Sequence, residues 1–162
     1  MEMYKYEPLV KKFYDGLDAG VFYGRKCLEC GTIEFPPYPA CNNCGNIGSE
    51  WVELTGEDVT VEEVYQVRPM YTVQEYMPYA PIFSAECKMD HGVEFVCLIF
   101  GITLKTYDQV RDSVPLKAKL VVMPMEGYNT FAVGINGAIP VRGEKRENTE
   151  MGKAIFKKVD DQ

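Results

Sequence analysis

The segment CLECGTIEFPPYPACNNCG, residues 27–45, decides how the rest of the sequence is interpreted. It contains two Cys-x-x-Cys-Gly turns, formed by Cys27 with Cys30 and by Cys41 with Cys44. Each turn presents two sulfurs to one ion, and the glycine after the second cysteine permits a tight backbone. Four thiolates around zinc form a closed tetrahedral site, so residues 21–49 are predicted to be a rubredoxin-like zinc ribbon. Iron in an electron carrier would use the same four ligands.

The predicted metal site is better suited to structure than to catalysis. A catalytic zinc ion keeps an open position and usually has histidine or carboxylate ligands, and a four-cysteine site offers neither. A segment this short cannot bury a sufficient core, and binding the metal supplies its folding free energy. We therefore expect the zinc ion to be structural.

The composition excludes several classes of protein. The chain of 162 residues has a formal net charge of −7, which argues against binding to a phosphate backbone. No apolar run approaches the roughly 18 residues of a membrane span, and the first residues lack the order of a secretory signal. We expect a cytoplasmic protein that binds neither nucleic acid nor membranes. Cys87 and Cys97 are then expected to be reduced core residues.

The order of elements predicts a mostly β fold with little α structure. Apolar residues at helical spacing indicate an amphipathic helix in residues 3–20, within an N-terminal region 1–20. About five strand-like runs follow in region 50–142, with a short helical or irregular link between the third and the fourth. That succession is typical of the five-stranded OB-fold barrel, although a six-stranded barrel or a small sandwich also fits. A charged arm at 143–162 ends the chain.

Two segments are interpreted as contact surfaces. The run FVCLIF, residues 95–100, lacks polar alternation, so we expect its outer face to be covered by the helix, the ribbon or another subunit. The loop before it is rich in tyrosine and methionine, which either cover the barrel or line an interface. The predicted interface residues are Tyr71, Tyr76, Met77, Tyr79 and Phe83, together with Phe156 in the arm.

No catalytic residues are expected in this chain. His91 is the single histidine, and it falls within a predicted hairpin turn. A catalytic base needs a nucleophile and an orienting group, and the sequence indicates neither. The sequence also contains no Gly-x-Ser-x-Gly elbow, P-loop or His-Glu-x-x-His motif.

The layout as a whole resembles one family. Its specific parts are the two Cys-x-x-Cys-Gly knuckles, the Phe-Pro-Pro between them, and EWVELTG leading into the barrel. These features are similar to the zinc-ribbon plus OB-fold proteins described as acyl-CoA-associated, non-catalytic partners of thiolase-like enzymes, over roughly residues 6–141. Family members act in archaeal hydroxymethylglutaryl-CoA synthesis, in steroid side-chain breakdown and in anaerobic aromatic degradation. Loop 68–83 and the charged arm are longer than is typical of the family, and they put the choice of partner and substrate in doubt.

The resemblance implies a small subunit that binds a thiolase-family dimer and helps to hold coenzyme A thioesters. The partner would supply the activated cysteine that a thiolase needs. Coenzyme A would favour scattered cations, and the candidates are Arg25, Lys26, Arg68, Lys88 and Arg142. An ordinary solvated charge is the alternative for each of them. A nucleic-acid-binding ribbon with an OB-fold, and a rubredoxin-like electron carrier, remain the alternative functions.

Overall fold

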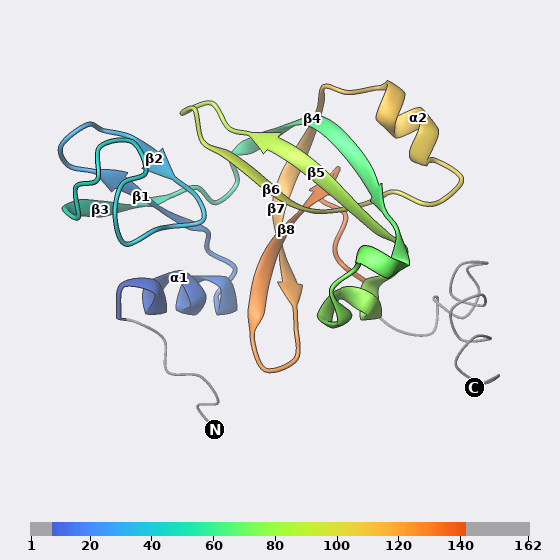
Figure 1. The fold of residues 1–162 in the computed structure, drawn as a ribbon, viewed down its shortest axis with the longest axis horizontal. Helices are drawn as coiled ribbons and strands as arrows, with labels where there is room; N and C mark the ends of the chain where they lie inside the picture. The colour runs from blue at the N-terminus through green and yellow to red at the C-terminus, as the bar shows by residue number, and fades with distance from the viewer. Residues whose placement is uncertain (1–7, 142–162) are drawn as a thin grey trace.

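Residues 8–141 are described by a computed structural model, in which a three-stranded sheet lies beside a five-stranded barrel (Figure 1). The elements are α1 (Pro8–Asp18), β1 (Tyr23–Cys27), β2 (Ile33–Glu34), β3 (Ser49–Glu53), β4 (Asp58–Val67), β5 (Ile82–Lys88), β6 (Glu94–Phe100), α2 (Tyr107–Asp112), β7 (Leu116–Pro124) and β8 (Asn129–Ile135). Two 3-10 helices, η1 (Pro69–Tyr71) and η2 (Gln74–Tyr79), join β4 to β5. Within residues 8–141, no helix is both long and apolar enough to cross a membrane.

Helix α1 ends in a glycine cap that directs the chain into the ribbon. Gly20 has a φ of 74°, a backbone conformation that favours glycine. The amide of Val21 donates to the carbonyl of Gly16 at 2.7 Å, and the amide of Gly20 donates to the carbonyl of Leu17 at 3.1 Å. This pair of bonds is the Schellman motif. The predicted helix is therefore confirmed over Pro8–Asp18, and residues 1–7 lie outside the described part of the chain.

The ribbon sheet has the order β2-β1-β3, and both neighbours pair antiparallel with β1. The sequence suggested that residues 50–53 begin the barrel, but the structure places them in β3 of the ribbon, with Trp51 opposite Arg25. The amide of Leu54 still donates to the carbonyl of Phe22 at 2.8 Å. The chain leaves the ribbon only after these bonds, at the turn containing Gly56, whose φ is 79°.

The five strands β4 to β8 close into a barrel with the order β4-β5-β6-β8-β7. All of these pairs are antiparallel except β6 with β8, where Ile99 pairs with Val133 in parallel register. Helix α2 is the connection between β6 and β7. The predicted five-stranded barrel, with a short helical link between its third and fourth strands, is therefore confirmed.

Four phenylalanines join the helix, the ribbon and the barrel into one core. Phe35 comes from the ribbon, Phe13 from α1, Phe95 from β6 and Phe131 from β8. The Phe35 ring centroid lies 4.6 Å from that of Phe131, 5.3 Å from that of Phe95 and 5.8 Å from that of Phe13. Edge-to-face rings at such distances stabilise the packing beyond the area that they bury.

The outer face of β6 is covered along only part of its length. Leu98 and Phe100 pack against a second apolar cluster that includes Tyr79 of η2. Val96, however, is 65% exposed. Within residues 8–141 this face is therefore covered by η2 at one end and is open at Val96, and neither the N-terminal helix nor the ribbon provides the predicted cover. Covering of Val96 by another subunit stays a prediction.

Candidate metal centre

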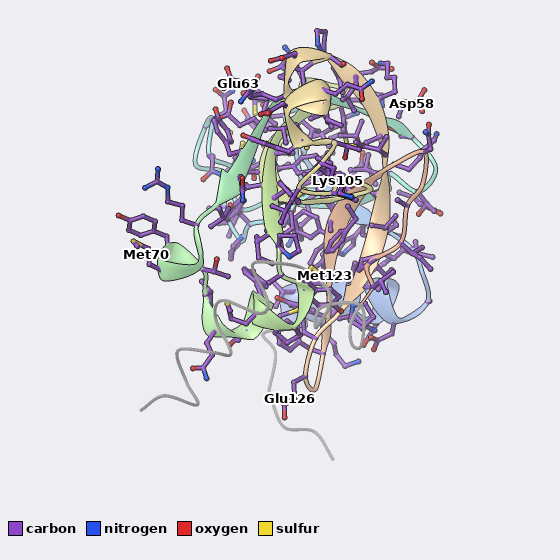
Figure 2. The ribbon with its side chains drawn as sticks, turned by 90° about the vertical axis from the view of Figure 1, so that its right-hand side faces the viewer. Asp58, Glu63, Met70, Lys105, Met123 and Glu126 are labelled. Atoms are coloured by element: carbon purple, nitrogen blue, oxygen red, sulfur yellow. The ribbon has the colours of Figure 1, made fainter. Side chains whose placement is uncertain are left out.

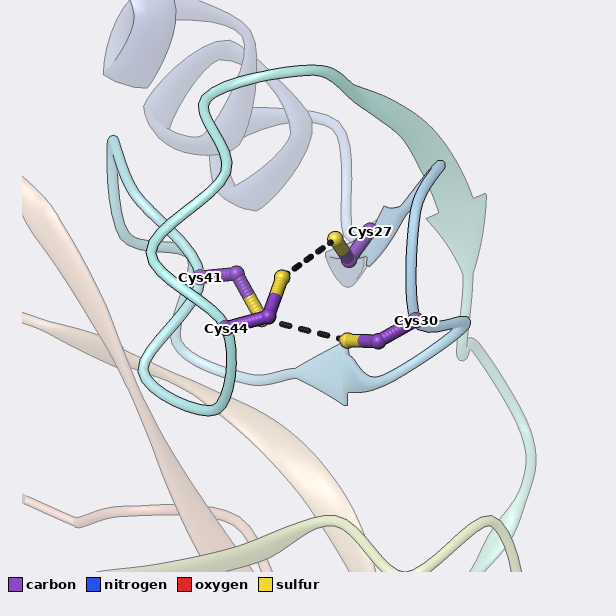
Figure 3. A group of neighbouring side chains, drawn as sticks. All are labelled: Cys27, Cys30, Cys41 and Cys44. Atoms are coloured by element: carbon purple, nitrogen blue, oxygen red, sulfur yellow. Dashed lines mark hydrogen bonds between the residues drawn. The ribbon is translucent and has the colours of Figure 1, made fainter.

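The four cysteines of the two knuckles converge beside the ribbon sheet (Figure 3). Cys27 ends β1, and the other three lie in the turns that follow β1 and β2. All four sulfurs lie within 4.8 Å of one another, with Sγ–Sγ distances of 3.5 Å for Cys27 and Cys44 and 3.6 Å for Cys30 and Cys41. The topology thus brings together ligands that are up to 17 positions apart in sequence.

The backbone of each knuckle is built in the same way. The amide of Gly31 donates to the carbonyl of Cys27 at 3.0 Å, and the amide of Gly45 donates to the carbonyl of Cys41 at 2.8 Å. Both glycines have positive φ, 73° and 77°. A side chain other than glycine would be strained there, which explains why each Cys-x-x-Cys pair is followed by glycine.

The arrangement fits a tetrahedral metal ion. Four thiolates about 2.3 Å from a zinc ion in a tetrahedron lie about 3.8 Å from one another, close to the observed sulfur separations. The hydrogen bond between Cys30 and the Thr32 hydroxyl, 3.1 Å long, is the main reason why the pKa of Cys30 is lowered to about 5. The residues present can therefore hold a zinc ion by four sulfurs, a coordination that leaves no open position for substrate.

The two cations that directly precede Cys27 lie on opposite faces of β1. Arg25 is only 8% exposed, and its guanidinium carbon lies 5.0 Å from the ring centroid of Trp51. Its Nε and Nη1 atoms are buried and form no hydrogen bond within the described residues. Lys26 alternates with Arg25 along the strand, is half-buried, and lies opposite Glu50. The pair predicted to bind coenzyme A is thus divided by the sheet.

The remaining predicted cofactor residues are spread over the barrel. Arg68 is exposed and follows the end of β4, where Val67 pairs with Ile82. Lys88 is at the opposite end of β5 and lies 3.9 Å from Glu94. Arg142 lies outside the described residues. The structure therefore does not gather the described candidates into a single site.

The predicted interface residues divide into three groups. Tyr71 is 73% exposed, whereas Tyr76 and Met77 are half-buried. Tyr79 and Phe83 are 5% and 3% exposed and belong to the core of this chain, so they are not accessible to a partner. Phe156 lies outside the described residues.

The structure shows two candidate contact features that the sequence does not reveal. Met70 and Val73 flank Tyr71 and are 77% and 56% exposed, and Figure 2 shows Met70 at the outer edge of the loop. A cavity of about 460 Å³ also lies where the ribbon meets the barrel. Its walls include Phe35 and Phe95. The Phe-Pro-Pro segment was the only sign of this cavity in the sequence, because the fold alone places that segment beside β6.

Part of the chain matches a known family. Residues 15–46 match the family described as ChsH2, rubredoxin-like zinc ribbon domain. The match spans the end of α1 and the four cysteines, and it identifies the ribbon as a zinc ribbon. No curated protein matches the chain.

Solved structures share the fold at low sequence identity. One is described as an Ltp2-ChsH2(DUF35) aldolase; it has a TM-score of 0.55 and 16% identity over 79% of this chain and 94% of that chain. Another is a protein of unknown function from the DUF35 family of Sulfolobus solfataricus, with a TM-score of 0.51 and 21% identity over 79% of this chain and 85% of that chain. At these identities the likeness shows that the ribbon and barrel occur together in other proteins.

Proposed function

We propose that this chain is the non-catalytic, zinc-binding subunit of a thiolase-type enzyme complex. The complex would cleave or form carbon–carbon bonds in acyl-CoA thioesters. The observation that carries the proposal is the closed four-sulfur centre, because it consumes all four coordination positions of the ion in holding the ribbon together. Zinc bound there supplies folding free energy to the ribbon and presents its surface to a partner.

The ribbon match and the structural neighbour support a role inside an enzyme complex. The matched domain takes its name from ChsH2, and the neighbour pairs a ChsH2 protein with Ltp2 in an aldolase. An aldolase, like a thiolase, acts on a carbon–carbon bond. We infer that the present chain likewise associates with a larger catalytic chain, most simply with a thiolase-family dimer.

The geometry around the single histidine supports a catalytic centre located in the partner. His91 is at the β5–β6 turn with its side chain 49% exposed, and its Nε2 atom lies 3.4 Å from a carboxylate oxygen of Glu57. A base that activates a cysteine or serine needs that nucleophile within hydrogen-bond reach. None of the described hydrogen bonds of His91 joins it to such a group.

We propose that loop 68–79 contributes to the partner interface. Met70, Tyr71 and Val73 expose apolar surface there, and tyrosine and methionine are enriched in interface cores. Arg68 begins this loop and would meet either the partner or the phosphate groups of coenzyme A. Lys26 is the accessible cation of the pair beside the metal centre and is the better candidate there for a CoA phosphate.

A finer assignment follows from the family resemblance alone. Among the enzymes of anaerobic aromatic degradation, the layout of the chain resembles that of the small subunit of a benzoylsuccinyl-CoA thiolase. We propose benzoylsuccinyl-CoA as the thioester on which the complex acts. Turnover of other 3-oxoacyl-CoA thioesters with higher kcat/KM would assign the complex to a different substrate.

Affinity purification of the chain from its native host tests the proposal. We expect a larger chain of the thiolase family to co-purify in fixed stoichiometry, identified by mass spectrometry, with one zinc ion per small subunit. Recovery of the chain alone under mild conditions, or with iron in place of zinc and a visible absorption band, would contradict the proposal.

A further inference from the structure

The first half of β6 has an unpaired edge. Along Glu94–Leu98 the strand pairs with β5, whereas its pairing with β8 is confined to Ile99 and Phe100. The amide of Met89 donates to the carbonyl of Val93 at 2.8 Å, which fixes the alternation of the ladder. In an antiparallel pair every second residue directs its amide and carbonyl toward the same neighbouring strand. Phe95 and Cys97, which follow Val93 by two and four residues, therefore direct theirs toward β5. The backbone groups of Glu94 and Val96 therefore face away from β5, toward the open edge.

A cavity lies along that edge. The cavity of about 460 Å³ is bounded on one side by residues 92–96 and on the other by residues 32–36 of the ribbon. In Figure 1 the β5–β6 hairpin reaches toward β2 of the ribbon. An added strand lies about 4.8 Å from its neighbour, so a free edge facing a cavity can accept one.

The walls of the cavity are aromatic on the inside and acidic at the rim. Phe35, Phe95 and Phe131 are among its lining residues, and Tyr38 and Val96 stand at its mouth with 49% and 65% of their surface exposed. Glu34 and Glu94 also line it, and the carboxylate of Glu34 accepts a hydrogen bond from the amide of Asn42 at 2.8 Å. An apolar side chain entering the cavity would meet aromatic rings, and a basic side chain at the rim would meet carboxylates.

The acidic rim continues over the outer face of the barrel. A second cavity of about 290 Å³ shares Glu94 and Val96 with the first and adds Glu62 and Glu86. Neither lining contains a lysine, arginine or histidine, and the nearest cation given for these carboxylates is Lys88, which lies 3.9 Å from Glu94. Glu86 also lies directly opposite Glu63 in the ladder, an arrangement of like charges that is unfavourable in an isolated sheet.

We propose that an extended, basic segment of a partner protein adds a strand to the open edge of β6. The amides and carbonyls of Glu94 and Val96 pair with the added strand. Basic side chains of that strand lie on the outer face beside Glu94 and Val96, where they also approach Glu86, and the aliphatic residues between them point toward Phe35. Main-chain bonds give such a complex its affinity, and the alternating side chains give it specificity.

This inference rests on the proposed function only in taking the catalytic partner as the natural source of the segment. The chemistry of the edge requires alternating basic and aliphatic residues in an extended conformation. A second copy of this chain would bring another acidic edge against the first, and like charges across an added strand oppose that pairing.

Binding of a model peptide to the full-length, zinc-loaded, ¹⁵N-labelled chain tests the proposal. The probe is a nine-residue blocked peptide in which lysine and valine alternate. A matched peptide has N-methyl groups on the lysines, which removes the amide donors on one edge, and another has glutamate in place of lysine. We expect chemical-shift changes confined to residues 32–36 and 86–98, together with slower hydrogen exchange at the Glu94 and Val96 amides. The N-methylated and glutamate peptides should bind at least tenfold more weakly.

Variants show whether the carboxylates take part. The double variant Glu86→Gln with Glu94→Gln should weaken binding of the lysine peptide by roughly tenfold and reduce its dependence on salt. Glu126→Gln is the matched control, because Glu126 is exposed at the β7–β8 turn (Figure 2), and it should bind like the wild type.

Several results would overturn the inference. The first is that the chemical-shift changes fall on another surface, and the second is that the N-methylated peptide binds as well as the lysine peptide. The third is that no binding is seen at millimolar peptide. The fourth is that spermine, which has positive charges but no peptide backbone, displaces the lysine peptide. Slow exchange of the Glu94 and Val96 amides in the free chain would also count against the inference in two cases. Protection that is lost on dilution would show that a second copy of the chain covers the edge. Protection that is lost on deletion of residues 143–162 would show that this segment covers it. A partner enzyme that co-purifies equally well with the double variant would reject this edge and leave the proposed function intact.

Discussion

The ribbon and the barrel are each stabilised in a different way. The barrel has a core of aliphatic residues from all five strands, including Val59, Val61 and Val133, which are completely buried. The ribbon sheet has short strands, one of them two residues long, and its knuckles contain Cys30 and Cys44 at the surface. Apolar burial suffices for the barrel, whereas the ribbon needs a metal ion. A change that removes one source of stability should therefore damage one region more than the other.

The largest effect is expected from removing a metal ligand. Cys41→Ser should abolish tight zinc binding and unfold the ribbon, because structural zinc contributes on the order of 10 kcal/mol to small domains that depend on it. Trp51 is the single tryptophan and lies in β3, so its fluorescence reports on the ribbon. We expect that signal to become unfolded-like while the amide spectrum of the barrel strands is retained.

The matched control is a cysteine in the barrel. Cys87→Ala removes a thiol that is 3% exposed, and it should leave one zinc ion per chain and a native Trp51 signal. Global unfolding in Cys41→Ser would show that the barrel also depends on the metal, and the contrast between the two regions would be lost.

A smaller effect is expected where the two regions meet. Phe35→Ala removes a ring that contacts Phe13, Phe95 and Phe131, and it should destabilise the chain by about 3–5 kcal/mol. Urea unfolding followed by Trp51 fluorescence and by far-UV circular dichroism should give two separated transitions instead of one. Tyr38→Ala, in the same segment but half exposed, should change stability by less than about 0.5 kcal/mol. Equal effects of the two substitutions would show that the ribbon does not depend on this packing.

A moderate effect confined to the barrel is expected at η2. The hydroxyl of Tyr79 donates a hydrogen bond to the carbonyl of Pro124 at the end of β7. Tyr79→Phe keeps the ring in place and removes this bond, which should cost about 1 kcal/mol in the unfolding transition seen by circular dichroism. Zinc affinity should be unchanged in a competition assay with a chromophoric chelator. A parallel loss of zinc affinity would mean that this barrel contact also stabilises the metal centre, and the contrast between the two regions would be lost.

The smallest effect is expected from a surface ion pair of the barrel. Lys119 lies 2.7 Å from Asp58, and its hydrogen bond and charge lower the pKa of that carboxyl below the ordinary value of 3.8. A carboxyl with a lowered pKa in the folded state stabilises the fold above its ordinary pKa and loses that contribution as the pH falls below it. Asp58→Asn should therefore lower the Tm by less than about 2 °C at pH 7 and leave it unchanged near pH 2. A Tm difference that grows toward low pH would contradict this assignment.

The parts of the fold that depend on local sequence could be predicted. The spacing of Cys27, Cys30, Cys41 and Cys44 predicts the metal centre because each pair is held by its own turn. Gly20 marks the end of α1, and Glu126 with Gly127 marks the hairpin between β7 and β8, for the same reason. These features are set by neighbours only a few residues apart.

The parts that depend on tertiary pairing could not be predicted. Residues 50–53 alternate like a barrel strand, and only their pairing with β1 assigns them to the ribbon. Tyr79 of η2 and Phe83 of β5 resemble interface residues in composition, yet both are buried in the core of this chain. Arg25 is predicted from sequence to bind coenzyme A or to be solvated, but Trp51 on the neighbouring strand covers its guanidinium. The open edge of β6 exists because β8 begins to pair only at Ile99.

Turnover measured on separated and recombined chains tests the central claim most directly. The isolated zinc-loaded chain, the isolated partner and the reconstituted complex should each be assayed for CoA-dependent cleavage of a 3-oxoacyl-CoA thioester. We predict that the isolated chain has no activity and that the complex is active. The Cys41→Ser chain should fail to form the complex or to restore its activity. Full turnover by the isolated 162-residue chain, or a complex that is equally active with the Cys41→Ser chain, would contradict the account.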